Sequence, residues 1–368
     1  LYFSWDSGAS LLDRSQPGFA TGAMSRLDFS PRLRMPLFTP LGSFTGDVSV
    51  SSTYYSDSQA APPSLPEGAG PVRLDRGLWR DAVSGSLEWR PPVLEKVFSG
   101  PGGWLGDRIE HTFEPEAGYH VTSGVDQADQ IIRFDAGDIL ANTSEVEYGF
   151  TNRLLAAGSQ PGQSRELASW TLLQKYYFDP TFGGALIPGD SNVFLTTALL
   201  SPFAAQAIPL RFSPLSSLVR VSPFTRFDGE WRLDYDSHSH QVSANAFTGN
   251  FHFGKGFVSG SNYLLRPPAG LLPAAAPPVY NQMRFATGYG DALAPGLSVA
   301  GAVAYDARTG RLQYTTFQMT HNWDCCGFSV EYRRFSLATL RRENQFLISF
   351  SLANVATFGN LKHQDQLF

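Results

Sequence analysis

The sequence predicts an all-β fold, a transmembrane antiparallel β-barrel of the outer-membrane type, and an incomplete part of a larger barrel. Apolar and polar residues alternate with period two along much of the chain. The apolar positions are rich in Phe, Tyr and Trp, whereas the opposite positions carry charges of both signs. We expect about 16 strands, or one per about 23 residues, whereas soluble β-sandwiches repeat every 8–12 residues or so. This spacing fits membrane-spanning strands of about 9–11 residues with alternately short and long connections.

The composition sets the class of protein. The chain has 368 residues, of which 17% are charged and 13% aromatic, and a typical soluble domain has about 25% charged residues. Disorder driven by high charge and low hydrophobicity is therefore excluded. The formal net charge of −5 gives no reason to expect nucleic-acid binding.

Five segments alternate cleanly and are predicted strands: 145–154, 227–236, 297–306, 328–333 and 345–352. In the last of them, Phe346, Ile348, Phe350 and Leu352 share one face, and Gln345, Leu347, Ser349 and Ser351 share the other. Two further segments, Asp190–Leu200 and Leu312–Trp323, lose phase midway, which predicts a β-bulge or a displaced boundary.

The segments between strands carry turn and loop signals. Tight turns are predicted at Gly254–Gly256, Ala294–Gly296 and Thr309–Gly310, and long Pro-rich loops at Ala60–Pro71 and Pro267–Pro278. No helical period of convincing length occurs. The longest uncharged stretch, Ser191–Leu210, contains Pro202 and Pro209, and we interpret it as a strand running into a loop.

The chemistry of the two faces indicates a membrane. In lipid, every backbone polar group must be hydrogen-bonded internally, so spanning strands must close into a barrel. The aromatic face then meets acyl chains, and the charged face lines a hydrated lumen. The chain opens with Leu1–Trp5, which has the pattern of a strand interior, and no signal peptide is visible. We therefore expect a fragment of a longer protein.

Candidate sites for catalysis find little support. His238 and His240 would place two imidazoles on one strand face, but they lie in a turn-like run without an obvious third ligand. No nucleophile elbow is present, and the many acidic residues are interpreted as lumen lining. The sequence therefore predicts no enzyme, no catalytic residue, no metal ligand and no cofactor.

The two cysteines, Cys325 and Cys326, are neighbours. Adjacent Cα atoms are about 3.8 Å apart, below the usual disulfide range of about 4.4–6.8 Å, and adjacent strand residues point to opposite faces. Each thiol is therefore either free or bonded to a cysteine elsewhere in a longer protein. Two free thiols would be a liability in an oxidising compartment, which favours bonded partners.

These cysteines also carry a resemblance to a known family. The run Trp323–Phe328, followed by Glu331–Arg333, resembles the Cys-Cys strand of the LPS-assembly outer-membrane protein, the LptD family. Weaker matches occur upstream and in order: Arg26–Arg32, His111–Pro115, Asp126–Asp129, Tyr148–Arg153 and Gln174–Phe178. The resemblance covers most of the chain, and only the Cys pair is specific by itself.

The resemblance implies a role in the bacterial cell outer membrane. Residues 1–368 would be the C-terminal part of the barrel domain, with the N-terminal periplasmic domain and the first strands absent. Such proteins insert lipopolysaccharide into the outer leaflet through a barrel lumen and a lateral seam. Implied partners are lipopolysaccharide, a plug lipoprotein of the LptE type, the periplasmic lipopolysaccharide-bridge proteins and outer-membrane lipid. Cys325 and Cys326 would form disulfides with the N-terminal domain, and the last strand, with Gln345, Phe346, Leu347, Ile348, Ser349, Phe350, Ser351 and Leu352, would line the seam.

Two other functions remain open at this stage. A porin-like passive channel, or another outer-membrane β-barrel transporter, is possible because about 16 strands would close a porin by themselves. The Cys pair and the mid-strand start argue against it. A barrel enzyme such as a lipase lacks a visible catalytic constellation.

Overall fold

A computed structural model describes most of the chain. The described residues are 1–13, 22–60, 72–100, 102–127, 130–132, 134, 138, 140–157, 164–184, 209–266, 279–291, 294–323, 325–337, 341–352 and 356–359. The predicted loops Ala60–Pro71 and Pro267–Pro278 fall almost entirely outside these residues, as does the predicted strand Asp190–Leu200.

The fold is all-β apart from one short 3₁₀ turn, η1 (Gly103–Leu105). The strands are β1 (Tyr2–Leu12), β2 (Met24–Thr39), β3 (Gly42–Tyr55), β4 (Ser58–Gln59), β5 (Arg73–Leu74), β6 (Leu78–Arg90), β7 (Leu94–Ser99), β8 (Arg108–Ser123), β9 (Thr143–Ala157), β10 (Ser164–Tyr177), β11 (Leu215–Phe224), β12 (Phe227–Asp236), β13 (Gln241–Phe253), β14 (Gly256–Leu265), β15 (Tyr280–Tyr289), β16 (Gly296–Asp306), β17 (Arg311–Asn322), β18 (Cys326–Leu337), β19 (Arg341–Leu352) and β20 (Ala356–Gly359).

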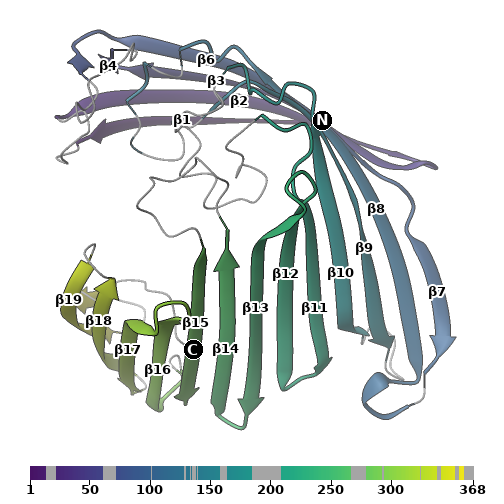
Figure 1. Cartoon of the computed structure of the whole chain (residues 1–368), viewed down its shortest axis with the longest axis vertical. Coiled ribbons are helices and arrows are strands. Elements are labelled where there is room, and N and C mark those ends of the chain that lie inside the picture. Colours follow the sequence, from purple (N-terminus) through teal and green to yellow (C-terminus); the bar gives the residue numbers. More distant parts are fainter. Residues whose placement is uncertain are drawn as a thin grey trace.

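Eighteen of these strands form one antiparallel sheet, a meander in which β3 pairs with β6 because β4 and β5 form a separate two-stranded sheet. Strands β6 and β7 pair with successive stretches of β8, and Pro91 and Pro92 lie at the break between them. Proline has no N–H to donate to the ladder, which explains the interruption. The sheet curves around an open centre (Figure 1), and among the described residues β1 pairs only with β2. The fold is thus an outer-membrane-type β-barrel whose wall is not closed.

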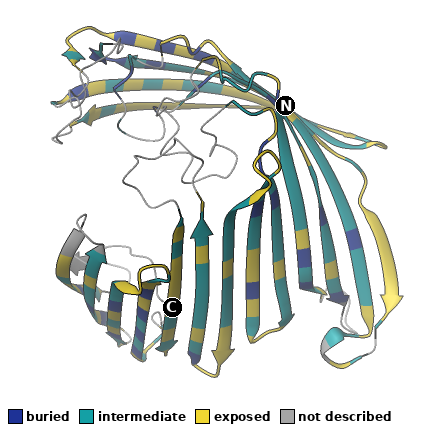
Figure 2. Ribbon diagram, viewed as in Figure 1, coloured by how far each residue is buried: buried dark blue, intermediate teal, exposed yellow. Residues whose placement is uncertain are grey.

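The two faces of the wall have opposite chemistry, and Figure 2 shows the alternation along single strands. On β19, Ser349 is only 8% exposed, whereas its neighbour Phe350 is 40% exposed. On β16, Ala300, Ala302 and Ala304 are buried, whereas Val303 and Tyr305, which alternate with them, are exposed. Buried polar and exposed apolar residues reverse the pattern of a soluble protein. The polar face is the concave, inner face of the wall, and the predicted strand phases are confirmed.

Two expectations about the strands need correction or refinement. The sheet has more strands than the roughly 16 expected, because short segments such as β7 and β20 carry too few residues for an alternation to be recognised. The phase loss within Leu312–Trp323 is explained by a register shift, in which Ala304 faces Tyr314 and Tyr305 faces Leu312. The bulge leaves Gln313 without a partner in the β16 ladder.

The connections differ between the two ends of the wall. At one end, here called the short-turn end, no connection exceeds eight residues; they are 40–41, 100–107, 158–163, 225–226, 254–255, 290–295, 323–325 and 353–355. At the other, the long-loop end, four connections are much longer; they are 56–77, 124–142, 178–214 and 266–279. This asymmetry is typical of outer-membrane barrels. None of the described helical segments is long and apolar enough to cross a membrane.

Candidate functional site: the inner wall and the short-turn end

Charged side chains on the inner face are organised into ion pairs that bridge strands. The Nζ of Lys175 on β10 lies 2.7 Å from a carboxylate oxygen of Glu145 and 3.3 Å from one of Glu147, both on β9. Arg153 on β9 lies 3.0 Å from Glu114 and 2.7 Å from Glu166. The acidic residues therefore line the lumen as structural partners of cations, as the sequence analysis expected.

A second network joins the long-loop end to the inner wall. Asp138, whose side chain is fully buried, accepts hydrogen bonds from the Nη1 of Arg26 and the hydroxyl of Tyr55, each at 2.9 Å. Its other oxygen accepts the backbone N–H of Phe134 at 2.8 Å. The connection that follows β8 is thereby held against the inner faces of β2 and β3.

An apolar cluster accompanies these hydrogen bonds. It consists of Met24, Tyr55, Leu78, Ile131 and Ile132, all buried. Burial of these side chains on the inner face resembles the core of a soluble domain, and it stabilises the connection at the mouth of the barrel.

At this same end, two aspartates outside the spanning segments have pKa values below the usual value for aspartate. Burial acts to raise the pKa of Asp57, but hydrogen bonds from Ser56 and Arg73 outweigh it and hold this pKa below its usual value. The Arg73 Nη2 lies 3.0 Å from Asp57 Oδ1 and donates to the backbone oxygen of Ala23 at 2.6 Å. The pKa of Asp179 is lowered chiefly by the hydrogen bond from the Thr181 hydroxyl.

The cysteine pair lies at the short-turn end, in the connection between β17 and β18. Cys325 is exposed, Cys326 is half-buried at the first position of β18, and their Sγ atoms lie 3.2 Å apart. The expectation that strand alternation sends the two thiols to opposite faces is therefore wrong. Cys325 precedes the strand, so the alternation does not apply to it. The N–H of Trp323 donates to the oxygen of Cys326 at 2.7 Å and closes the turn.

The expected seam residues lie on β19, but β19 is not the last strand of the sheet. The four-residue strand β20 pairs with it, from Ser349 opposite Gly359 to Leu352 opposite Ala356. Residues Ser349, Phe350, Ser351 and Leu352 therefore already have a neighbour on that edge. The described ladder with β20 ends at Ser349, so it does not include Gln345, Phe346, Leu347 or Ile348 of the expected seam.

The histidine pair lies in a turn, as its sequence context predicts. His238 and His240 lie in the exposed four-residue turn after β12, where the N–H of His238 donates to Asp236. Among the described residues, no group of three or more His, Cys, Asp or Glu side chains has the arrangement of a metal site.

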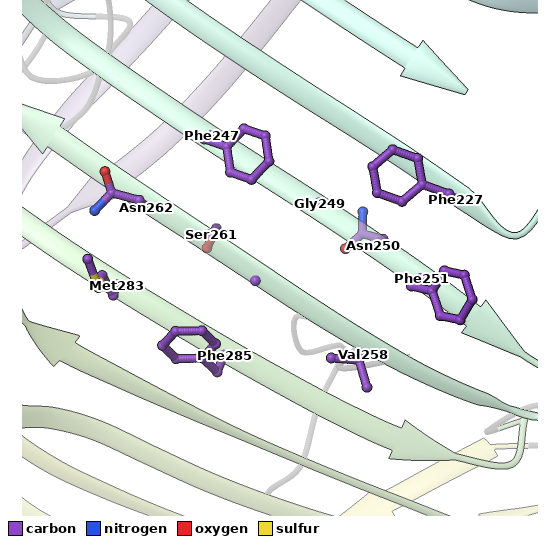
Figure 3. Close-up of a pocket in the computed structure, with 11 residues that line it drawn as sticks. Phe227, Phe247, Gly249, Asn250, Phe251, Val258, Ser261, Asn262, Met283 and Phe285 are labelled. Carbon is purple, nitrogen blue, oxygen red and sulfur yellow. The ribbon is translucent and has the colours of Figure 1, made fainter. Parts of the chain in front are cut away.

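The outer face of β12–β15 carries a shallow apolar groove of about 420 Å³ (Figure 3). Gly249 and Gly260, which lie opposite each other, form part of its floor, and Gly229 on β12 continues this row of glycines opposite Gly249. Phe247 and Phe285 stand beside this floor. Because the groove belongs to the lipid-facing surface, it is not part of a hydrophilic route through the lumen.

Sequence reasoning assigned no role to Asp138 or to the charged residues of β2 and β3. Asp138 and Arg26 are 112 residues apart, and no local pattern links them. One signal was available: Ile131 and Ile132 are adjacent apolar residues in the connection between β8 and β9, and apolar side chains in such a connection indicate that it packs against the wall.

Comparison with known proteins gives one family. The sequence profile described as "LPS transport system D", LptD, matches residues 1–290. A curated relative, the LPS-assembly protein LptD of Thiobacillus denitrificans, is 28% identical over 196 residues, which make up 48% of this chain and 24% of the relative. The chain thus matches about a quarter of that relative's length.

Among solved structures, a mutant of the Rh. blastica porin aligns with a TM-score of 0.35 and 11% identity, covering 91% of this chain and 95% of the porin. The family match spans more than half of the chain, from β1 to the start of the connection after β15, including the inner-wall ion pairs described above. The chain belongs to the LptD family of lipopolysaccharide transport proteins.

Proposed function

We propose that this chain is the C-terminal part of the barrel of a protein that assembles lipopolysaccharide into the outer leaflet of the bacterial outer membrane. The observation that supports this most is the wall itself: a charged, hydrogen-bonding inner face and an apolar outer face, in a chain of the LptD family. A phosphorylated glycolipid headgroup needs a hydrated, polar path, whereas its acyl chains are stable in the bilayer. No covalent step is required of such a path.

The orientation follows from the connections. Outer-membrane barrels place short turns in the periplasm and long loops outside the cell. The short-turn end, which carries Cys325 and Cys326, then faces the periplasm. A periplasmic N-terminal domain would meet the barrel there and receive lipopolysaccharide from the bridge proteins, while a lipoprotein of the LptE type would plug the lumen.

The exit for lipid is a lateral seam beside β19. Residues Gln345–Ile348, which lie beyond the described β20 ladder, would border the first strand of the complete barrel. A net cost of about 0.5–1.5 kcal/mol per separated hydrogen bond, where water replaces it, keeps such an opening accessible.

The proposed transport is tested by site-specific photo-crosslinking in cells that express the full-length protein. A photoreactive residue replaces Ser84 on the inner face of β6, and a second variant carries it at Val83, the adjacent residue on the outer face. We expect lipopolysaccharide adducts at position 84 that depend on ongoing lipopolysaccharide synthesis, and fewer at position 83. Equal labelling at both positions, or adducts unaffected when synthesis stops, would contradict transport along the inner wall.

The cysteine pair has its own test. We propose that Cys325 and Cys326 each form a disulfide with the N-terminal domain and hold it over the periplasmic mouth. In the mature full-length protein, we expect neither thiol to react with a maleimide until a reductant is added. Lys255→Cys, which places a new thiol in the exposed β13–β14 turn at the same end, should react without reductant. Labelling of the native cysteines before reduction would refute the bridging role.

A further inference from the structure

Two arginines on the inner face of β2 share one carboxylate. The Nε atoms of Arg32 and Arg34 lie 2.6 Å and 3.1 Å from the same oxygen of Asp47, on β3. The Asp47 side chain is only 9% exposed, whereas the two arginine side chains are 47% and 50% exposed. The carboxylate therefore lies against the wall, and the guanidinium groups extend into the lumen.

The charges of this group do not cancel. Two guanidinium groups on one carboxylate leave a local charge of +1. Each guanidinium has five N–H donors, and the bond to Asp47 uses only Nε. Within the described part of the chain, no other side chain accepts a hydrogen bond from either arginine, so the terminal amino groups remain available to a ligand.

The other ion-paired cations of the described inner wall each meet at least one carboxylate of their own. Arg153 and Lys175 each meet two glutamates, and Arg220 meets Glu230 at 2.8 Å. Among the described ion pairs of the inner wall, the Arg32–Arg34 group is thus distinguished by an excess of positive charge.

Hydroxyl groups surround the arginines. In the strand register, Arg32 lies between Ser4 on β1 and Ser49 on β3, and Ser49 is followed by Ser84 on β6. Directly paired residues share a face of the sheet. The neighbourhood therefore combines positively charged hydrogen-bond donors, the guanidinium groups, with small neutral donors, the serine hydroxyls. This combination suits a phosphate carried on a sugar.

We propose that Arg32 and Arg34 form a phosphate-binding site on the inner wall, with Asp47 as the residue that positions both guanidinium groups. The planar guanidinium fork matches the oxygen geometry of phosphate and binds it bidentately. The ligand is the phosphorylated sugar headgroup of a glycolipid, an assignment that rests on the proposed lipopolysaccharide transport. The shared chemistry also admits free phosphate, and the test separates the two.

The test is equilibrium binding to the full-length protein in detergent at low salt. The probes are purified lipopolysaccharide, the same material after enzymatic dephosphorylation, and inorganic phosphate as competitor. The variant carries Arg32→Gln and Arg34→Gln together. A second variant with Lys at both positions keeps the charge but loses the fork. The control is Arg220→Gln, which changes an exposed, singly paired arginine on the same face. Retained heat-modifiable mobility on gels verifies that each variant folds.

We expect the Gln double variant to bind phosphorylated lipopolysaccharide about tenfold more weakly, the Lys variant to be intermediate, and Arg220→Gln to stay within about twofold of wild type. Dephosphorylated lipopolysaccharide should bind the wild type and the double variant alike. Undiminished binding by the double variant, or an equal loss for both forms of the lipid, would overturn the arginine site alone. Displacement by inorganic phosphate at equal concentration would overturn the headgroup as ligand. Failure of the wild-type protein to bind either lipid form would instead contradict the proposed function.

Discussion

The longest strands of the wall lie in its N-terminal half, whereas the strands of the C-terminal half are shorter, although both halves form the same antiparallel meander. Strands β2, β3, β8, β9 and β10 have 14–16 residues, whereas β11–β19 have 10–13. Because about 9–11 residues suffice to span a bilayer, the N-terminal strands extend beyond it. On the outer face this extension is marked by Ser52, whose hydroxyl donates to Asp81 at 2.5 Å, a polar contact unsuited to acyl chains.

The added length supports folded structure at the long-loop end. The network around Asp138 and the cluster with Ile131 and Ile132 pack on the extended parts of β2, β3 and β6. In the C-terminal half, two of the connections at the same end, 237–240 and 307–310, have only four residues. The height of a barrel wall therefore depends on what its loops must hold as well as on membrane thickness.

The largest expected effect comes from Asp138→Ala. It removes the acceptor of the buried Tyr55 hydroxyl and one of the carboxylates that Arg26 meets, the other being Asp28; loss of one partner of a buried ion pair costs about 3–5 kcal/mol. We expect proteinase K to cleave within 124–142 while the barrel keeps its heat-modifiable mobility.

The matched control is Asp306→Ala in the C-terminal half. Asp306 accepts the N–H groups of Arg308 and Thr309 in an exposed four-residue turn, so its loss should cost about 1 kcal/mol. Equal protease resistance of the two variants would show that the N-terminal loop does not depend on Asp138.

The next effect tests where each half leaves the membrane. Phe247→Arg places a cation on the lipid face near the middle of β13 and should cost about 2–4 kcal/mol if that position lies at the bilayer midplane. Leu27→Arg also faces outward, but Leu27 aligns with Trp79, the next outward-facing residue beyond Asp81 toward the long-loop end. Its cost should therefore be about 0–1 kcal/mol. Urea titrations of the protein refolded into bilayers measure both values. Similar costs would mean that the two halves have the same height.

A smaller effect is the acid sensitivity of the β4–β5 connection. The pKa of Asp57 is lowered in the folded protein, so its contribution is complete above the unfolded value of about 3.9 and is lost as the pH falls through the folded value. We expect the protection factor of the Gln59 N–H, which donates to Gln130, to fall below about pH 4. In Arg73→Gln this protection factor should already be lower at pH 7, by an amount that corresponds to about 1.5 kcal/mol. A wild-type protection factor that does not change with pH would count against this ion pair.

The smallest effect concerns the outer groove of the C-terminal half. A Cβ added at Gly249 would meet the Phe247 and Phe227 rings at ordinary contact distances of 3.5 Å and 3.9 Å. Gly249→Ala should therefore stabilise the barrel by about 0.5–1 kcal/mol, because glycine loses more backbone entropy on folding. Gly288→Ala on the inner face would overlap the Phe257 ring and should destabilise by about 1–3 kcal/mol. Urea midpoints that shift in the same direction would contradict this difference in packing.

The sequence by itself determined the class of fold, the phase of the long strands and the tight turns. Period-two alternation is a local property of the sequence. The opposite phase around Phe328–Arg333 would place the charge of Glu331 in lipid, so the pattern allows only one assignment of residues to the two faces. The turn at Gly254–Lys255 and the exposed turn around His238 could likewise be predicted from the sequence, because turn formation depends on adjacent residues.

Only the tertiary structure decided which distant residues meet. Asp138 finds Arg26, three glycines from β12, β13 and β14 fall into one row, and Arg32 and Arg34 share Asp47 because strand register aligns them. The proximity of the Cys325 and Cys326 sulfurs depends on β18 beginning at Cys326, so that Cys325 still belongs to the turn and strand alternation does not apply to it. Register and loop docking are set by the sum of many contacts across the sheet, and no window of the sequence contains both partners.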